Sequence, residues 1–226
     1  PGTATFESPT NVTTAVAFSS SGTYTLRITA SDTQFTVSDQ VIVVVGANLV
    51  AADWITQDLS PISARRGQGL EYGGHFSVSG AGGGYTGTSD GAHVMVRQVS
   101  GDSSIVARLT NLPTATALSG LTMRDSLARG AIRTVLGFIP ATGLQLRART
   151  NGSTADTLVA SASGLSLPLW LKLERTAATE VVTAWYAADN AGTPGVWTQL
   201  GTATAIVMGD AAQIGLTTTN NSTAGV

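Results

Sequence analysis

The chain has 226 residues, only 12% of them charged, and a formal net charge of −2 at pH 7. An average soluble domain has about 25% charged residues, so hydroxyl and small side chains must cover much of this surface. The small net charge and the lack of a basic run argue against a nucleic-acid partner. The absence of cysteine excludes disulfides and thiolate chemistry, and no apolar run reaches the ~18 residues that a membrane span needs.

From the N-terminus onward, apolar residues recur at every second position, which predicts strands with one buried face. The pattern is clearest in "GTYTLRITASD" at 22–32, where Tyr24, Leu26 and Ile28 fall on one side. It recurs at 12–18, 41–45, 105–109, 144–148 and 169–173. Turn signals at 20–22, 100–102, 151–152 and 190–195 separate the runs. Short strands punctuated in this way predict an all-β fold built of sandwiches.

A domain boundary is expected near residues 46–48. The apolar run 40–45 ends at Gly46, and a new pattern starts at Leu49. The residues before the boundary supply about four strands, whereas a complete sandwich needs roughly seven. We therefore expect residues 1–46 to be the end of an Ig-like β-sandwich whose beginning lies outside this sequence.

The first region resembles the C-terminal half of a PKD-type immunoglobulin-like domain. The resemblance covers residues 1–46 and rests on the Gly22-Thr23-Tyr24 corner, the alternating strand 26–32 and the valine-rich closing strand. Such domains act mostly as spacers in large secreted or surface proteins, and the resemblance implies the same role here.

The second region, residues 48–226, resembles the concanavalin A-like (laminin-G-like) jelly-roll modules of large bacterial extracellular proteins. The matching stretches include "GHFSVSGAG", "SGLTMRDSL" and "PLWLKLERT". The sequence departs from the family at 82–86, "GGGYT", and it stops where the family has one more strand. The resemblance implies a jelly-roll β-sandwich with its last strand missing, in a secreted or cell-surface bacterial protein.

No catalytic site is expected, so the chain is predicted not to be an enzyme. A β-sandwich glycosidase needs two carboxylates ~5–9 Å apart on one sugar, and the Glu-x-Asp-x-(x)-Glu spacing of the concanavalin A-like glucanases is absent. His75 and His93 do not have a metal-binding spacing. Isolated aspartates are interpreted as turn or cap residues: Asp58, Asp90, Asp102 and Asp125.

Calcium is the one cofactor that the sequence leaves open. Asp189 and Asn190 in a Gly-rich loop, or Asp102 after Gly101, could supply oxygen ligands. Ca²⁺ takes six or more oxygens, and no dense acidic cluster is present, so turn chemistry is the favoured interpretation. No cofactor and no metal site are predicted.

Sugar binding needs flat apolar faces for pyranose rings and planar donors for hydroxyl or acidic groups. Arg147 and Arg149 point away from the apolar side of their strand, as do Trp170, Lys172 and Trp185 on theirs. If these strands are neighbours, the five residues form one ligand-binding surface. The alternative is that the tryptophans cap the edge of the core and the arginines form ordinary surface pairs.

The favoured interpretation is a non-catalytic module that recognises polysaccharide or a cell-surface glycan in adhesion. The alternative is an architectural repeat of an extracellular stalk or filament, which contacts copies of itself or adjacent modules. Two explanations fit the incomplete sandwiches expected at both ends. The sequence is an excerpt of a longer chain, or neighbouring chains supply the missing strands by strand addition.

Overall fold

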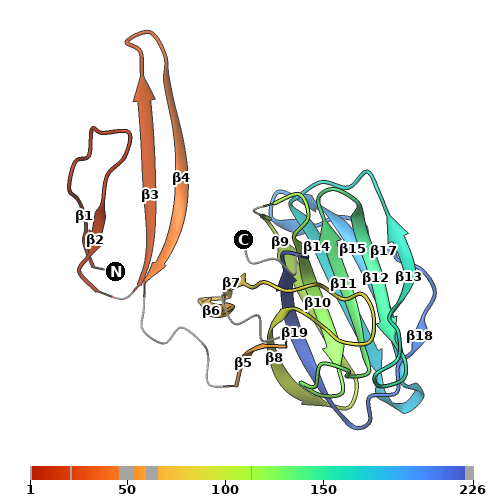
Figure 1. Cartoon of the computed structure of the whole chain (residues 1–226). Coiled ribbons are helices and arrows are strands. Elements are labelled where there is room, and N and C mark those ends of the chain that lie inside the picture. The colour runs from red at the N-terminus through yellow and green to blue at the C-terminus, as the bar shows by residue number, and fades with distance from the viewer. Residues whose placement is uncertain (1, 21, 46–52, 60–65, 113, 222–226) are drawn as a thin grey trace. The chain divides into compact units, whose positions relative to one another are not determined.

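The computed structural model describes residues 2–20, 22–45, 53–59, 66–112 and 114–221. Within these residues the regular structure is β-strand except for the short 3₁₀ helix η1 (Ala177–Thr179). The chain divides into two compact units, residues 1–51 with 70–76 and residues 52–69 with 77–226. The predicted all-β fold is confirmed (Figure 1), whereas the expected boundary at 46–48 lies outside the described residues.

The first unit contains two antiparallel hairpins. Strand β1 (Ala4–Phe6) pairs with β2 (Val16–Phe18), and β3 (Gly22–Ser31) pairs with β4 (Thr36–Val45). Tyr24 packs against Phe18 with the ring centroids 4.6 Å apart, and its hydroxyl donates to the Ser20 carbonyl at 2.7 Å. The alternation at 22–32 therefore does form a strand, while its assignment to a PKD-type domain remains a prediction.

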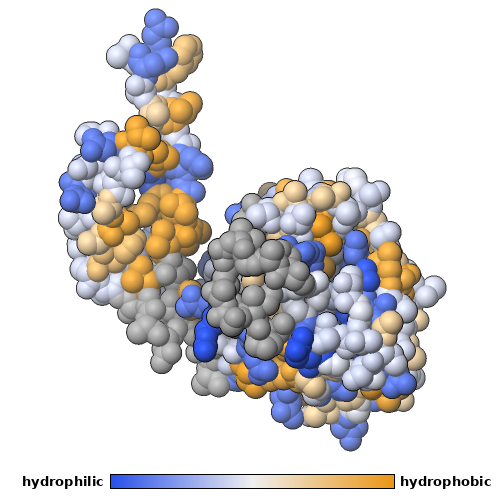
Figure 2. Space-filling view, in the orientation of Figure 1, coloured by the Kyte–Doolittle hydropathy of each residue, from blue (hydrophilic) through white to orange (hydrophobic). Residues whose placement is uncertain are grey.

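The β3–β4 hairpin has a polar face and an apolar face. On the apolar face Leu26 and Ile28 follow each other along β3, and Val41 lies directly across from Leu26. Much of this face is open, since Ile28 is 67% and Val37 68% exposed. Figure 2 shows apolar side chains gathered on this unit. Among the described residues, β3 and β4 pair only with each other.

The second unit is a sandwich of two antiparallel sheets. The seven-stranded sheet has the order β13 (Thr157–Ala162), β12 (Gly143–Arg149), β11 (Arg133–Ile139), β10 (Leu118–Arg124), β19 (Ala211–Thr219), β8 (His93–Ser100) and β5 (Ile55–Asp58). The six-stranded sheet has the order β16 (Thr193–Pro194), β15 (Val181–Asn190), β14 (Leu169–Thr176) and β9 (Ser103–Leu109), and β17 (Thr198–Gln199) and β18 (Thr204–Ala205) also pair with β15. A separate hairpin joins β6 (Gln68–Tyr72) to β7 (His75–Ser79), and its residues 70–76 are grouped with the first unit.

The core lies between the two sheets and uses the alternation that the sequence predicts. Leu144, Leu146 and Ala148 of β12 point into it from one sheet, and Leu169 and Leu171 of β14 from the other. Full burial of each large aliphatic side chain contributes about 1.5–3 kcal/mol. Strands distant in sequence lie side by side, as β19 does between β10 and β8, which is the connectivity of a jelly-roll sandwich and not of a simple meander.

Candidate functional site

The five residues predicted to bind a ligand lie on two different sheets. Arg147 and Arg149 are on β12 of the seven-stranded sheet, whereas Trp170 and Lys172 on β14 and Trp185 on β15 belong to the six-stranded sheet. Strands β12 and β14 are not neighbours, so the single surface that the sequence suggested does not form. The period-two pattern assigned the correct side of each strand, but it cannot determine which strands pair.

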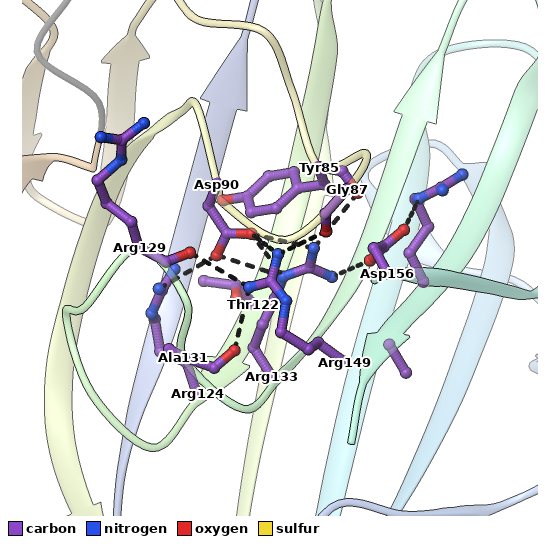
Figure 3. A network of polar contacts seen from close by, with 12 residues as sticks. Tyr85, Gly87, Asp90, Thr122, Arg124, Arg129, Ala131, Arg133, Arg149 and Asp156 are labelled. Carbon is purple, nitrogen blue, oxygen red and sulfur yellow. Dashed lines mark hydrogen bonds and ion pairs between the residues drawn. The ribbon is translucent and has the colours of Figure 1, made fainter. Parts of the chain in front are cut away.

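The two arginines belong to a buried Arg–Asp network, which we define as Asp90, Arg124, Arg133, Arg149 and Asp156 (Figure 3). All five side chains are 0% exposed, and Arg147 joins the edge of the network with 16% of its side chain exposed. The expectation that Arg147 and Arg149 form an outer binding surface is therefore corrected. They do face away from the core, but a further layer of the chain covers that side of the sheet.

Asp90 is the centre of this network. Its carboxylate accepts hydrogen bonds from Arg124 at 3.2 Å and from Arg133 at 3.1 Å, and it is 2.9 Å from Nη2 of Arg149. Asp156 neutralises the other side of Arg133, with Nη1 and Oδ1 2.5 Å apart, and accepts from Arg147 at 2.6 Å. Burial by itself would lower the pKa of Arg133, but Asp90 and Asp156 outweigh it and raise the pKa overall.

Other guanidinium N–H groups of Arg124 and Arg149 donate hydrogen bonds to backbone carbonyls of the loops. Arg124 donates to the carbonyls of Ser126 and Ala128 at 2.5 and 2.7 Å. Arg149 donates to the carbonyls of Thr154, Arg129, Ala131 and Gly87, all at 3.0–3.2 Å. These carbonyls belong to three separate loops, so the two buried arginines bond the backbone of all three loops to the sheet.

Residues 80–92 provide the cover over this side of the seven-stranded sheet. Tyr85 lies in their centre, 1% exposed, and packs with Ala92, Leu118 and Val135. The Arg133 guanidinium lies 4.6 Å from its ring centroid, its hydroxyl is hydrogen-bonded to Thr217, and burial raises its pKa. These contacts of Tyr85 hold the cover against the sheet.

The other three predicted residues do come together, on the outer face of the six-stranded sheet. Lys172 lies directly across from Trp185 in the β14–β15 pair. Its ammonium is 5.0 Å from the Trp185 ring centroid and 4.9 Å from that of Trp197. Trp170 is two residues before Lys172 on the same side of β14, and all three indoles are half-buried. We call Trp170, Lys172, Trp185 and Trp197 the Trp–Lys surface.

Ion pairs hold this surface in place. Asp189 accepts two hydrogen bonds from Arg108, at 2.7 and 2.8 Å, and a third from Nε1 of Trp170 at 2.8 Å. The Arg108 hydrogen bond is the main reason that the pKa of Asp189 lies well below its ordinary range, and the same bond raises the pKa of Arg108. Lys172 is paired with Glu174 at 3.2 Å. Each of these cations thus has its own carboxylate.

A polar cleft of about 410 Å³ adjoins the Trp–Lys surface. Glu174, the partner of Lys172, and Thr183, two residues before Trp185, both line it. The other lining residues are Asp102, Ser103, Ser104, Arg175 and Thr176. Indole faces next to a cleft rich in hydroxyl and carboxylate groups provide stacking and hydrogen bonding within one continuous region.

Sequence reasoning missed several of these residues. Trp197 is not among the predicted ligand-binding residues, yet it contacts Lys172, and its place after a Gly-rich loop gives no signal. Asp90 was interpreted as a turn residue, yet it is the centre of the buried network. Asp102 does act as a cap, since it accepts from the backbone N–H of Ala177 at the start of η1.

Among the residues that it describes, the structure adds no oxygen ligands to the calcium site that the sequence left open at Asp189. The carboxylate of Asp189 accepts from Arg108, Trp170 and the Gly192 backbone, so its oxygens are already engaged. Within the described residues, no group of three His, Asp or Glu side chains could hold a metal ion. In the same part of the chain, no helix combines the length and the hydrophobicity of a membrane span.

Comparisons with known proteins add a distant structural likeness. No protein-family model matches the chain, and no curated protein matches its sequence. Among solved structures, the chain is similar to lectin I from Ulex europaeus in complex with the methyl glycoside of α-L-fucose, with 9% sequence identity and a TM-score of 0.31. The likeness covers 76% of this chain and 100% of the lectin chain.

Proposed function

We propose that the second unit is a glycan-recognition module that binds polysaccharide on the Trp–Lys surface. The observation that carries this proposal is the gathering of Trp170, Trp185 and Trp197 on one open sheet face beside a polar cleft. Indole faces pack against the apolar faces of pyranose rings, and cleft hydroxyls and carboxylates bond sugar hydroxyls. Arg147 and Arg149 have no part in it, because the Arg–Asp network is buried.

The charge arrangement favours a neutral glycan over an acidic one. Arg108 and Lys172 each have a carboxylate partner within 3.2 Å. The cleft adds Glu174 and Asp102, which would repel an anionic sugar. An acidic polysaccharide would have to displace these carboxylates, whereas a neutral one needs only stacking and hydroxyl bonding. We therefore expect binding to depend little on salt.

Retention in native gels that contain a soluble neutral polysaccharide tests this function. A set of glucan, mannan and galactan gels covers the main neutral classes, and a polyuronate gel serves as the acidic comparison. Trp185→Ala and Trp170→Ala are each expected to weaken retention about tenfold or more, since buried aromatic contacts dominate binding energies. Trp54→Ala is the matched control, because Trp54 stacks on Arg97, outside the Trp–Lys surface. Equal weakening by all three variants, or no retention in any neutral gel, would contradict the proposal.

The setting that we propose for this module is a secreted or cell-surface bacterial protein with further modules in series. The resemblance of both regions to modules of large secreted and cell-surface proteins supports this setting. Fractionation of the source cells, followed by surface labelling, is the direct test.

A second candidate function is supported by the first unit. The apolar face of β3–β4 leaves Ile28, Val37 and Val41 more than half exposed, which is unusual for a face with no function. A sheet of a neighbouring β-sandwich of the same kind is the partner that fits this apolar face, through face-to-face packing. Light scattering of the wild-type chain and of an Ile28→Ser/Val37→Ser variant tests for assembly through this face. If copies assemble through it, the molar mass measured for the variant in solution should be smaller than that of the wild type.

A further inference from the structure

A hydroxyl, an imidazole and a carboxylate lie in line at one edge of the seven-stranded sheet. Asp58 of β5 is directly across from His93 of β8, and Thr56 lies two residues before Asp58 on the same side of β5. Nδ1 of His93 is 2.8 Å from Oδ1 of Asp58, and Nε2 is 2.7 Å from Oγ1 of Thr56. Both imidazole nitrogens are therefore bonded, one to the carboxylate and one to the hydroxyl.

The surroundings assign a direction to these bonds. The carboxylate of Asp58 also accepts from the backbone N–H of Gly67, at 2.9 and 3.2 Å to its two oxygens. Because an ionised carboxylate can only accept, Nδ1 of His93 carries the proton. In the neutral imidazole Nε2 is then an acceptor, and the Thr56 hydroxyl donates to it. In this arrangement Nε2 of His93 can accept the proton of the Thr56 hydroxyl.

The base and the hydroxyl residue of this site differ in burial, as catalysis requires. His93 is only 2% exposed, and the backbones of Gly67 and Gly80 lie so close to it that neither position has room for a Cβ. The imidazole is thus fixed in one orientation. Thr56 is an exposed residue on the edge strand β5, and its Oγ1 lies beside the imidazole and close to the Gly69 backbone. A buried base that is fixed by a third group and bonded to the hydroxyl of an exposed residue is the arrangement of an activated nucleophile.

We propose that Thr56, His93 and Asp58 form an ester-cleaving site, with Thr56 as the nucleophile, His93 as the general base and Asp58 as the residue that orients the imidazole. The substrate class is a small carboxylic ester, because the hydroxyl of an exposed residue on an edge strand can approach a short acyl group without an enclosing pocket. The site is on a different sheet from the Trp–Lys surface, so it does not depend on the glycan proposal.

The reaction balances without a metal or an oxidant. Oγ1 of Thr56 attacks the ester carbonyl carbon while its proton passes to Nε2 of His93, and the bond from that carbon to the alkoxy oxygen breaks. His93 then gives the proton to the departing alkoxide, which leaves as the alcohol. A water molecule attacks the acyl-threonine next and, again with His93 as base, releases the carboxylic acid and restores Thr56.

This inference revises two expectations from the sequence. Asp58 was interpreted as a turn residue, but it lies within β5 and orients His93. The prediction that the chain is not an enzyme considered paired carboxylates and metal-ligand spacings, neither of which this site uses. His93 is separated in sequence from Thr56 and Asp58 by β6, β7 and the 80–92 cover, so only the pairing of β5 with β8 brings the three residues together.

Hydrolysis of p-nitrophenyl acetate by the full chain tests the proposal. Thr56→Val removes the hydroxyl and keeps the side-chain shape, whereas Thr56→Ser keeps the hydroxyl. We expect Thr56→Val and His93→Gln to lose at least ~100-fold of the wild-type rate, in line with the usual contribution of a base and its nucleophile. Thr56→Ser should retain the rate. His75→Gln is the matched control, because His75 is the other histidine of the chain and is exposed.

Covalent labelling provides a second measurement that a purely structural role would not affect. A fluorophosphonate probe should form an adduct on Thr56, located by tandem mass spectrometry, and the adduct should be absent from His93→Gln. If His93→Gln does not fold, the comparison of Thr56→Val with Thr56→Ser still decides. Equal hydrolysis by wild type and Thr56→Val, loss of the rate in His75→Gln, or a probe adduct away from Thr56 would overturn the assignment.

Discussion

The two outer faces of the sandwich have the same alternating pattern in the sequence, but one face is covered by another segment of the chain and the other is partly open. Each has strands in which Arg, Lys or Trp alternates with apolar core residues. On the seven-stranded sheet, residues 80–92 cover that side, and Arg149 is completely buried. On the six-stranded sheet, the corresponding side stays partly open, and Lys172 lies between two indoles. The comparison teaches that strand periodicity identifies the side of a residue, while the layer above that side determines its role.

The two faces also use charge differently. In the Arg–Asp network, three arginines and two aspartates are fully buried. Backbone carbonyls accept from several of the remaining donors, while Nη1 of Arg124 has no hydrogen-bond partner in the part of the chain that the structure describes. Burying such ions is costly unless every member has partners. On the Trp–Lys side the pairs are simple and partly solvated, so each contributes little to stability. Substitutions in the Arg–Asp network should therefore destabilise the fold more than substitutions in the ion pairs beside the Trp–Lys surface.

Removal of Asp90 is expected to have the largest effect. Asp90→Ala takes the shared carboxylate from Arg124, Arg133 and Arg149, which leaves buried charges uncompensated, so unfolding should become easier by about 5 kcal/mol. Urea unfolding followed by tryptophan fluorescence measures it, and Asp90→Asn keeps the shape if the alanine variant does not fold. The control is Asp53→Ala, because Asp53 forms an exposed pair with Arg97 at 3.6 Å and should change stability by less than ~1 kcal/mol. Similar losses in both would contradict a special role for the network.

Arg149 and Arg147 sharpen the comparison within a single strand. Arg149→Ala removes the donors to Asp90 and to four loop carbonyls, so we expect a loss of about 3 kcal/mol. Arg147→Ala should cost only about 1 kcal/mol, because Arg147 is partly exposed and Asp156 keeps Arg133 as its partner. The same urea experiment measures both. A larger loss for Arg147→Ala than for Arg149→Ala would show that the burial of the two side chains does not determine their energetic roles.

The smallest effect is a pH dependence on the open face. The pKa of Asp189 is depressed, first through its hydrogen bond from Arg108. Its bonds therefore stabilise the fold fully above the ordinary carboxyl pKa of ~4 and are lost progressively as the pH falls below it. Asp189→Asn should differ from wild type most at pH 7 and progressively less toward pH 2. Urea midpoints across that range test this, with Arg108→Gln expected to follow the same trend. A difference that does not change with pH would contradict it.

Much of the fold could be predicted from the sequence. The alternation at 144–148 and 169–173 placed each strand and its buried side correctly. The alternation at 22–32 placed a strand, but the face predicted to be buried is largely open, since Ile28 is 67% exposed. Trp170, Lys172 and Trp185 also fell on one surface, because β14 and β15 are joined closely in sequence. The burial of Arg149 could not be predicted, since it depends on Tyr85 and Asp90 in a Gly-rich segment with no periodic signal. Long-range contacts of this kind leave no local pattern.

A glycan array that carries neutral and acidic polysaccharides, probed with wild type, Trp185→Ala and Arg147→Ala, tests the central claim most directly. If the open face is the binding site, wild type and Arg147→Ala bind the same neutral glycans with equal strength, and Trp185→Ala loses them while remaining folded. If Arg147→Ala loses binding and Trp185→Ala keeps it, or if only acidic glycans are bound, the assignment of recognition to the Trp–Lys surface is wrong.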